Sequence, residues 1–193
     1  MSLPIPVPTS RKNAIASFAY WVQQNVLPYM PTNGLSQAFK LEQSSWENTE
    51  AYPNITITER GMPDIGPLAF NDTVGQANNA TMRQTLLEIN IQDRLADGNE
   101  SVRQTIRLAR EVLWQTLYYS GQSDSTGATL APSIPILNFD DSNTPHSATD
   151  GFVWWPDEET NTWFETEYFS SSSDPNLKRI QIMLRIRWFE FRN

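Results

Sequence analysis

The sequence LLEINIQDRLADGNESVRQTIRLAREVLWQTLYY, from Leu86 to Tyr119, decides the fold of this chain. Residues 87–91 alternate between apolar and polar side chains, as a half-buried strand does. From residue 101 to residue 119 the apolar side chains instead recur at helical spacing. Only a short turn at residues 97–99 separates the two patterns. Such a direct passage from strand to helix predicts a helix packed on a sheet, not a helical bundle or an all-β sandwich.

The helix predicted at residues 101–119 carries two distinct faces. Gly121 follows it and favours an end to the helix there. The apolar face, which we expect to pack on the sheet, consists of Val102, Ile106, Ala109, Leu113 and Leu117. Three arginines lie together on another face: Arg103, Arg107 and Arg110.

The flanking sequence supplies the other elements of a sheet with helices. Residues 11–27 predict a helix, capped by Thr9 or Ser10 and ended by Pro28. Residues 39–41 and 55–59 alternate at period two and predict strands with one buried face. Residues 162–169 and a long C-terminal strand flank a polar turn, which predicts a hairpin. Apolar positions alternate along that last strand at Ile180, Ile182, Leu184, Ile186 and Trp188.

These elements predict an α+β fold with a mostly antiparallel sheet, two main helices packed on one face, and a long loop insertion. With 193 residues, the chain is long enough for one substantial core. We expect an extended arm at residues 1–9, where prolines alternate with apolar residues, and one domain at residues 10–193. Residues 121–161 are acidic and rich in Ser, Thr and Pro, and they predict a functional or partly disordered excursion.

Composition excludes several classes of protein. The chain has no cysteine, which removes disulfides, thiolate nucleophiles and zinc–thiolate sites. No apolar run approaches the roughly 20 residues that span a bilayer, so we expect no membrane segment. The net charge of -8 argues against a dedicated duplex-DNA binder, because such affinity comes from Lys and Arg that neutralise phosphates.

Charge is unevenly distributed along the chain. Residues 111–177 contain no Lys or Arg but hold 11 of the 22 acidic residues, whereas the last 16 positions carry five basic residues. In a monomer, Glu165 and Glu167 would face Arg185 and Arg187 as cross-strand pairs. In an oligomer, the acidic part of one subunit would instead meet the basic strand or the arginine face of another. Both arrangements remain open at this point.

No catalytic or cofactor-binding pattern stands out in the sequence. The single histidine, His146, lies in the polar insertion, where a solvated loop residue is expected, and a relay with Ser147 and Asp150 lacks separately braced positions. Neither a phosphate-binding glycine loop nor a calcium loop is present. We therefore expect a protein that is not an enzyme and that uses no cofactor and no metal. The tryptophans at 154, 155 and 163 favour burial in the core or at a subunit interface.

The order and texture of these elements resemble those of the bacteriophage tail terminator family. The resemblance covers residues 10–120 and 162–192: the N-terminal helix, the strand near 53–59, the strand–helix unit and the closing hairpin. It implies a virion structural protein, assembled in the host cytoplasm, that forms a ring on the tail tube and joins it to the neck or head. It also implies that genomic DNA passes through the ring without specific binding.

The partners that the resemblance implies are other copies of the chain in a ring, expected to be a hexamer, the tail tube protein and a neck or connector protein, with a sheath as a further candidate. Two alternatives remain open: another neck or head-completion connector, and a small carbohydrate- or ligand-binding module that uses the aromatic residues of the insertion. An enzyme that uses His146 ranks third. The residues that we expect at a subunit interface are Arg103, Arg107, Arg110, Arg185, Arg187, Trp188, Glu165 and Glu167.

Overall fold

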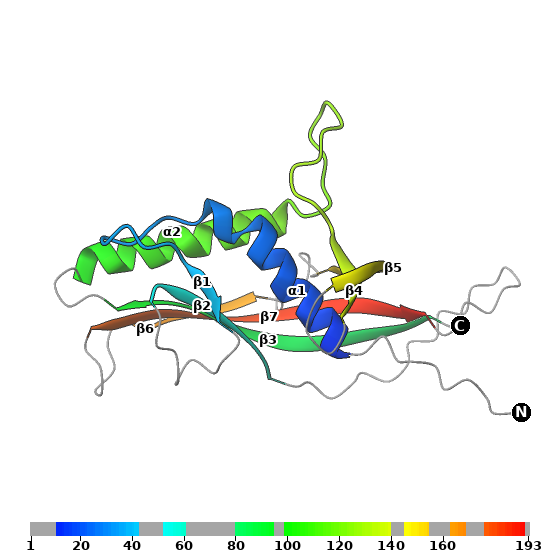
Figure 1. Ribbon diagram of the computed structural model, residues 1–193, viewed down its shortest axis with the longest axis horizontal. Helices are drawn as coiled ribbons and strands as arrows, with labels where there is room; N and C mark the ends of the chain where they lie inside the picture. The colour runs from blue at the N-terminus through cyan, green and yellow to red at the C-terminus, as the bar shows by residue number, and fades with distance from the viewer. Residues whose placement is uncertain are drawn as a thin grey trace, which may run out of the picture.

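The computed structural model describes residues 11–42, 52–60, 80–94, 99–139, 145–154, 163–168 and 176–191. Within them the chain has an α+β fold in which helices lie over one face of a mostly antiparallel sheet (Figure 1). The fold class predicted from the sequence is confirmed. Three predicted features lie outside the described residues: the N-terminal arm at residues 1–9, the cap of the first helix at Thr9 or Ser10, and the turn at residues 97 and 98.

Both predicted helices are present. Helix α1 spans Arg11–Asn25 and is followed by the short 3-10 helix η1, Leu27–Tyr29, which contains Pro28. Helix α2 spans Asn99–Tyr118. Gly121 follows α2 with a φ of 72°, in the left-handed region that glycine adopts without strain. The side chains that the sequence assigned to the apolar face of α2 are all buried: Val102, Ile106, Ala109, Leu113 and Leu117.

The described strands form one sheet in the order β1-β2-β3-β7-β5-β4, and β6 pairs with another part of β7. Only the β1–β2 pair is parallel among the described pairs. The predicted C-terminal hairpin is confirmed as β6 and β7. The strands are β1 Lys40–Glu42, β2 Asn54–Glu59, β3 Ala80–Arg94, β4 Ile134–Phe139, β5 Pro145–Trp154, β6 Trp163–Tyr168 and β7 Leu177–Phe191.

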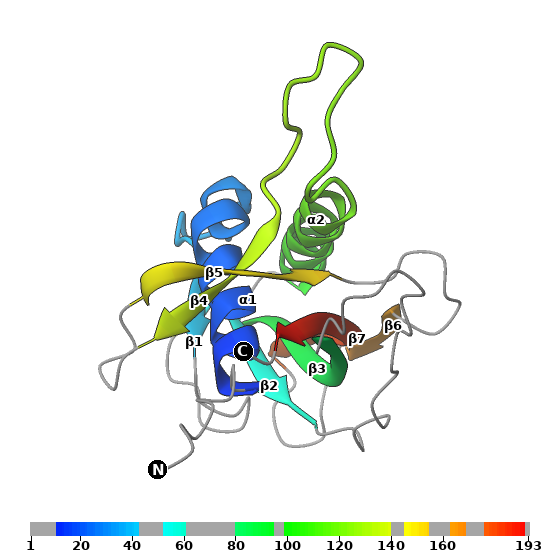
Figure 2. The same cartoon turned by 90° about the vertical axis from the view of Figure 1, so that its right-hand side faces the viewer.

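The centre of the sheet is the antiparallel pair of β3 and β7, which match residue by residue from Ala80–Phe191 to Arg94–Leu177. Apolar residues of both strands point to the same face, where Ile89 lies opposite Ile182 and Leu87 opposite Leu184. Both helices cover this face (Figures 1 and 2), so the hydrophobic core lies between the helices and the sheet.

The opposite face of β3 is polar, yet its side chains are also buried. Glu88 and Asn90 are almost fully enclosed, and both belong to one hydrogen-bonded group with Thr56 and Arg60. Burial raises the pKa of Glu88, but hydrogen bonds from Arg60, Asn90 and Gln181 outweigh it, and the pKa lies below its ordinary value. The alternation in the sequence therefore separates an apolar from a polar face, but not a buried from an exposed one.

Much of the predicted insertion is regular structure rather than a loop excursion. Residues 134–139 and 145–154 form β4 and β5, which pair with each other, and β5 joins β7 through Val153–Trp188 and Trp154–Arg187. Ile134 and Ile136 alternate with less buried residues and lie in the core. The polar average of residues 121–161 concealed this short apolar alternation.

Of the rest of the insertion the structure describes residues 121–133, which project from the body of the molecule beside the end of α2 (Figures 1 and 2). Backbone hydrogen bonds close its base, from Gly121 N to Ala131 O (2.8 Å) and from Leu130 N to Gln122 O (2.9 Å). The Asp124 carboxylate organises its tip by accepting hydrogen bonds from the backbone N–H groups of Thr126 and Ala128. These bonds hold the segment in a defined shape. We call residues 121–133 the projecting loop.

Candidate subunit-interaction site

The acidic residues of β6 do not face the arginines that the sequence suggested. In the observed register Glu165 lies opposite Ile182 and Glu167 opposite Ile180, so the expected cross-strand pairs with Arg185 and Arg187 are wrong. Side chains alternate along a strand, and this register places both glutamates on the helix-covered face of the sheet. They lie at the edge of that face, where the arginines of α2 reach them.

Arg107 and Arg110 of α2 pair with these glutamates within one chain. The Arg107 Nη2 atom lies 2.9 Å from Glu167 Oε2, and Arg110 Nε donates to Glu165 Oε1 at 2.7 Å. The indole N–H of Trp163 donates to the same Glu165 oxygen. The spacing from Arg107 to Arg110 and Trp114 places all three on one side of the helix. We call these residues the α2–β6 cluster: Arg107, Arg110, Trp114, Trp163, Glu165 and Glu167.

Aromatic contacts complete the α2–β6 cluster. The rings of Trp114 and Trp163 meet edge to face with centroids 4.9 Å apart, and the Arg110 guanidinium lies 5.9 Å and 6.0 Å from the two centroids. Burial lowers the pKa of Arg110, but the hydrogen bond to Glu165 and the charges of Glu165 and Glu111 outweigh it and raise the pKa above its ordinary value. The cluster therefore stabilises the packing of β6 against α2 within one chain.

We expect Arg110→Ala to destabilise the fold more than Arg107→Ala. The Arg110 side chain is 28% exposed and contacts two tryptophan rings, whereas Arg107 is 52% exposed. Loss of the exposed pair should cost about 0.2–1 kcal/mol, and loss of the Arg110 pair with its cation–π contacts about 1–2 kcal/mol. Urea denaturation of both variants measures the difference. Equal losses would show that the tryptophan contacts add nothing.

The other expected interface residues occupy different places. Arg103 lies one helical turn before Arg107 on the same side of α2 and is half-buried. Arg185 and Arg187 are half-buried on the polar face of β7. Trp188 is enclosed in the core of the single chain, which corrects its assignment to a subunit surface. The structure therefore brings together Arg107, Arg110, Glu165 and Glu167, but places Arg185 and Arg187 on the other face of the sheet.

The structure also places some of the residues that the sequence suggested for catalysis or for sugar binding. His146 belongs to strand β5 and not to a loop, which corrects that expectation. Trp163 meets Trp114 edge to face and packs partly buried against the core, whereas the side chains of Trp154 and Trp155 lie outside the described residues. Across the described ranges, no group of three or more His, Cys, Asp or Glu side chains is placed to hold a metal ion. No helix there is long and apolar enough to cross a membrane.

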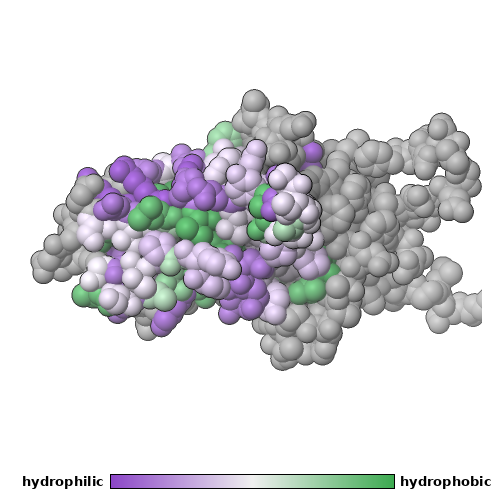
Figure 3. Space-filling view, turned by 90° about the horizontal axis from the view of Figure 1, so that it is seen from above, coloured by the Kyte–Doolittle hydropathy of each residue, from purple (hydrophilic) through white to green (hydrophobic). Residues whose placement is uncertain are grey.

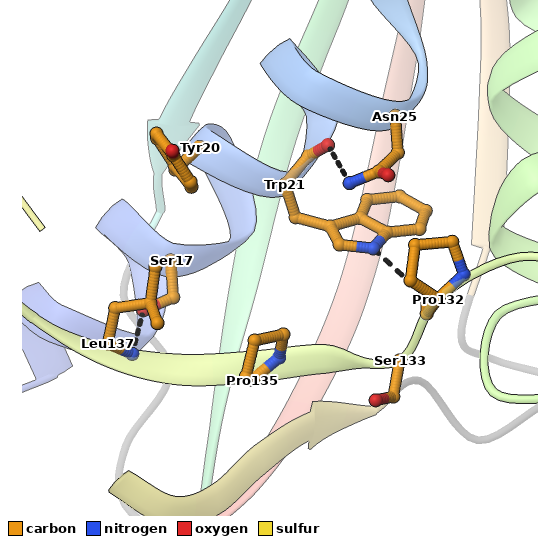
Figure 4. A pocket seen from close by; sticks show the side chains of 8 residues that line it. All are labelled: Ser17, Tyr20, Trp21, Asn25, Pro132, Ser133, Pro135 and Leu137. Atoms are coloured by element: carbon orange, nitrogen blue, oxygen red, sulfur yellow. Dashed lines mark hydrogen bonds between the residues drawn. The ribbon is translucent and has the colours of Figure 1, made fainter. Parts of the chain in front are cut away.

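A groove that the sequence did not predict lies beside α1. Its first part, a depression of about 320 Å³, lies between α1 and the wall formed by residues 132–133 and β4 (Figure 4). Two hydrogen bonds fix its walls, from Trp21 Nε1 to Pro132 O (3.0 Å) and from Leu137 N to Ser17 Oγ (2.8 Å). The residues that line it are Ser17, Tyr20, Trp21, Asn25, Pro132, Ser133, Pro135 and Leu137.

A second depression, of about 260 Å³, adjoins the first, and Asn25 and Pro132 line both. It reaches the end of α2 and the base of the projecting loop. The residues that line it are Asn25, Tyr29, Gln115, Thr116, Tyr119, Leu130, Ala131 and Pro132. We call the two depressions together the aromatic groove.

Large apolar side chains are exposed at one end of the aromatic groove. Tyr29 is 73% exposed, Leu130 49% and Tyr119 42%. Seen from the side of the helices, hydrophobic residues appear between hydrophilic ones (Figure 3). Exposed apolar side chains that lie together favour interaction with another molecule. No short pattern signals this groove, because Trp21 and Pro132 are 111 positions apart in the sequence.

Comparison of the chain with protein-family models and with curated proteins finds no match.

Proposed function

We propose that this protein is a bacteriophage tail terminator, a structural protein whose copies close into a ring on the end of the tail tube. The ring, a hexamer, stops growth of the tube and presents a surface to the neck or connector protein. The protein resides in the virion where the tail meets the neck, after assembly in the host cytoplasm. The proposal joins the resemblance in the order of the elements to the surface described above.

The observation that carries the proposal is the exposed apolar end of the aromatic groove. A monomer that leaves Tyr29, Tyr119 and Leu130 in water loses the free energy that their burial would provide, about 25 cal/mol per Å² of apolar surface. A ring of identical subunits buries such a surface once in every subunit contact. This supports a protein whose role is assembly.

The projecting loop supports a contact at the end of the ring. Residues 121–130 are exposed, and their hydrogen bonds keep them in a defined shape. A preorganised loop loses less conformational entropy when it binds than a flexible one does. We assign the tube protein or the neck protein as its partner, with the sheath as a further candidate.

The net charge of -8 supports a ring through which DNA slides without adhering, because an acidic protein repels phosphates. The α2–β6 cluster has a structural role in this proposal. Arg107 and Arg110 neutralise Glu167 and Glu165 within each subunit. Arg103, Arg185 and Arg187 stay predicted interface residues in this proposal.

Assembly of tail tubes in the presence of the protein tests the proposal. We expect electron microscopy to show shorter tubes with a ring at one end, and native mass spectrometry to show a hexamer. Leu130→Asp should reduce ring formation by placing a charge in the groove. Leu108→Asp is the matched control, because Leu108 is 51% exposed but does not line the groove.

Two outcomes would contradict the proposal. Tubes of unchanged length, together with a protein that stays monomeric beside them, would exclude a terminator. A ring that binds a neck protein but leaves the tubes unchanged would instead identify a connector.

A further inference from the structure

We propose that the aromatic groove of one subunit binds the proline-rich segment Leu3 to Pro8 of a second copy of the chain. This inference rests on the proposed function, because it requires an oligomer, and it names the contact that joins neighbouring subunits. The segment reads Leu-Pro-Ile-Pro-Val-Pro, and only Thr9 and Ser10 separate it from the start of α1.

The groove has the chemistry that binds proline-rich chains. Segments with a proline at every second position favour the polyproline II conformation, and aromatic grooves bind this preformed shape at low entropic cost. Tyr20, Trp21 and Tyr29 follow one another along α1 and η1, and the turn directly after α2 contributes Tyr119. The half-buried Tyr20 ring and the exposed Tyr29 and Tyr119 rings provide flat apolar surfaces against which proline rings can pack, whereas the buried Trp21 ring only forms part of the wall.

Hydrogen bonding favours the same partner. Proline offers a carbonyl oxygen but no N–H, so a surface that binds it must donate hydrogen bonds. The hydroxyl groups of the exposed Tyr29 and Tyr119 side chains are such donors. The Trp21 indole N–H is already committed to Pro132 O, where it fixes the wall of the groove instead.

Charge and length also match. The residues that line the groove are all uncharged, and so are residues 3–8. From Ser17 to Tyr29 the groove follows α1 and η1 for about 20 Å, given the rise per residue of the two helix types. Six residues in the polyproline II conformation extend about 19 Å. The segment is therefore about as long as the two adjoining depressions together.

A second copy is the better source of the segment than the chain itself. To reach its own groove, the segment would have to reverse direction within Thr9 and Ser10 before α1 begins. In a closed ring with head-to-tail contacts, each subunit donates one segment and receives one, so no segment and no groove is left unmatched.

Disulfide trapping tests the proposal cleanly, because the full chain contains no cysteine. One population carries Ile5→Cys, and a second, with a different mass tag, carries Leu130→Cys. The two are mixed under assembly conditions and oxidised. The matched control replaces Leu130→Cys with Leu108→Cys, which has similar exposure outside the groove. We expect roughly tenfold more mixed dimer with Leu130→Cys, because docking raises the local thiol concentration.

The outcomes separate this inference from the proposed function. Equal yields with Leu130→Cys and Leu108→Cys, or a link only within a chain that carries both Ile5→Cys and Leu130→Cys, would overturn the inference. A hexamer that caps tubes without the mixed link leaves the function standing and this contact wrong. If the mixed link forms but the protein does not cap tubes, the contact is correct and the proposed function is wrong. Replacing Pro4, Pro6 and Pro8 with alanine in the Ile5→Cys chain should reduce the mixed dimer, and an unchanged yield would contradict recognition of the prolines.

Discussion

Trp21→Ala is expected to lower the free energy of unfolding by about 3–5 kcal/mol, the usual cost of truncating a buried tryptophan. The Trp21 side chain is 3% exposed and belongs to the main core. It also ties α1 to a segment 111 positions away through its hydrogen bond to Pro132 O. Its loss therefore removes a core contact and a wall of the aromatic groove together. Urea denaturation monitored by circular dichroism measures the change.

Trp21→Phe separates these two effects. Phenylalanine retains much of the apolar burial but cannot donate to Pro132 O, so we expect a loss of about 1–2 kcal/mol. The base of the projecting loop should also open more often, which faster hydrogen exchange at the Gly121 amide would report. Trp163→Phe is the matched control, because it removes an indole N–H from the α2–β6 cluster. If both variants changed Gly121 exchange equally, Trp21 would not anchor the loop.

Most elements of the fold follow from local sequence patterns, but strands β4 and β5 and the site do not. Strand β3 and helix α2 appear in the sequence as periods of two and of about 3.6 residues, since each buries one face of its own. The register of β6 on β7 could not be derived, because a polar connection of several residues fixes no register, unlike a two-residue turn. The sequence pattern alone therefore predicts the wrong arginine partners for Glu165 and Glu167.

The aromatic groove shows a second limit of local patterns. Its walls come from α1, η1, α2, β4 and the segment before β4, which approach one another only in the folded chain. Tyr20 and Tyr29 have no feature in the sequence that distinguishes them from core aromatics. The remaining wall was also not predictable from composition, because the polar composition of residues 121–161 predicts a loop where β4 and the segment before it lie. A window of six residues over Ile134–Phe139 would have found that strand.

Arg60→Ala is expected to cost about 2–3 kcal/mol at neutral pH, because it leaves a buried carboxylate without its cation. Glu88 is 2% exposed and accepts hydrogen bonds from Arg60 and from Asn90 Nδ2, the latter at 2.9 Å. Glu88→Gln should cost less, about 1 kcal/mol, since the half-exposed Arg60 can return to water. Arg60→Ala/Glu88→Gln should be less destabilised than the sum of the two single variants. Additive losses would show that the two groups are not coupled.

The pH dependence of Arg60→Ala gives the sharper test of this pair. In the native chain the pKa of Glu88 lies below its unfolded value, so its stabilising contribution is present above the unfolded pKa and is lost as pH falls through the folded pKa. Without Arg60, burial dominates and should raise that pKa above the unfolded value. Protonation of Glu88 then removes the cost of burying its charge in the variant. The difference in the free energy of unfolding between the variant and the native chain should therefore shrink towards about pH 3.5. Arg107→Ala, whose partner Glu167 is partly exposed, should show a smaller deficit that changes less with pH. A deficit of Arg60→Ala that stayed constant between neutral pH and about pH 3.5 would show that its cost comes from lost packing and not from the charge on Glu88.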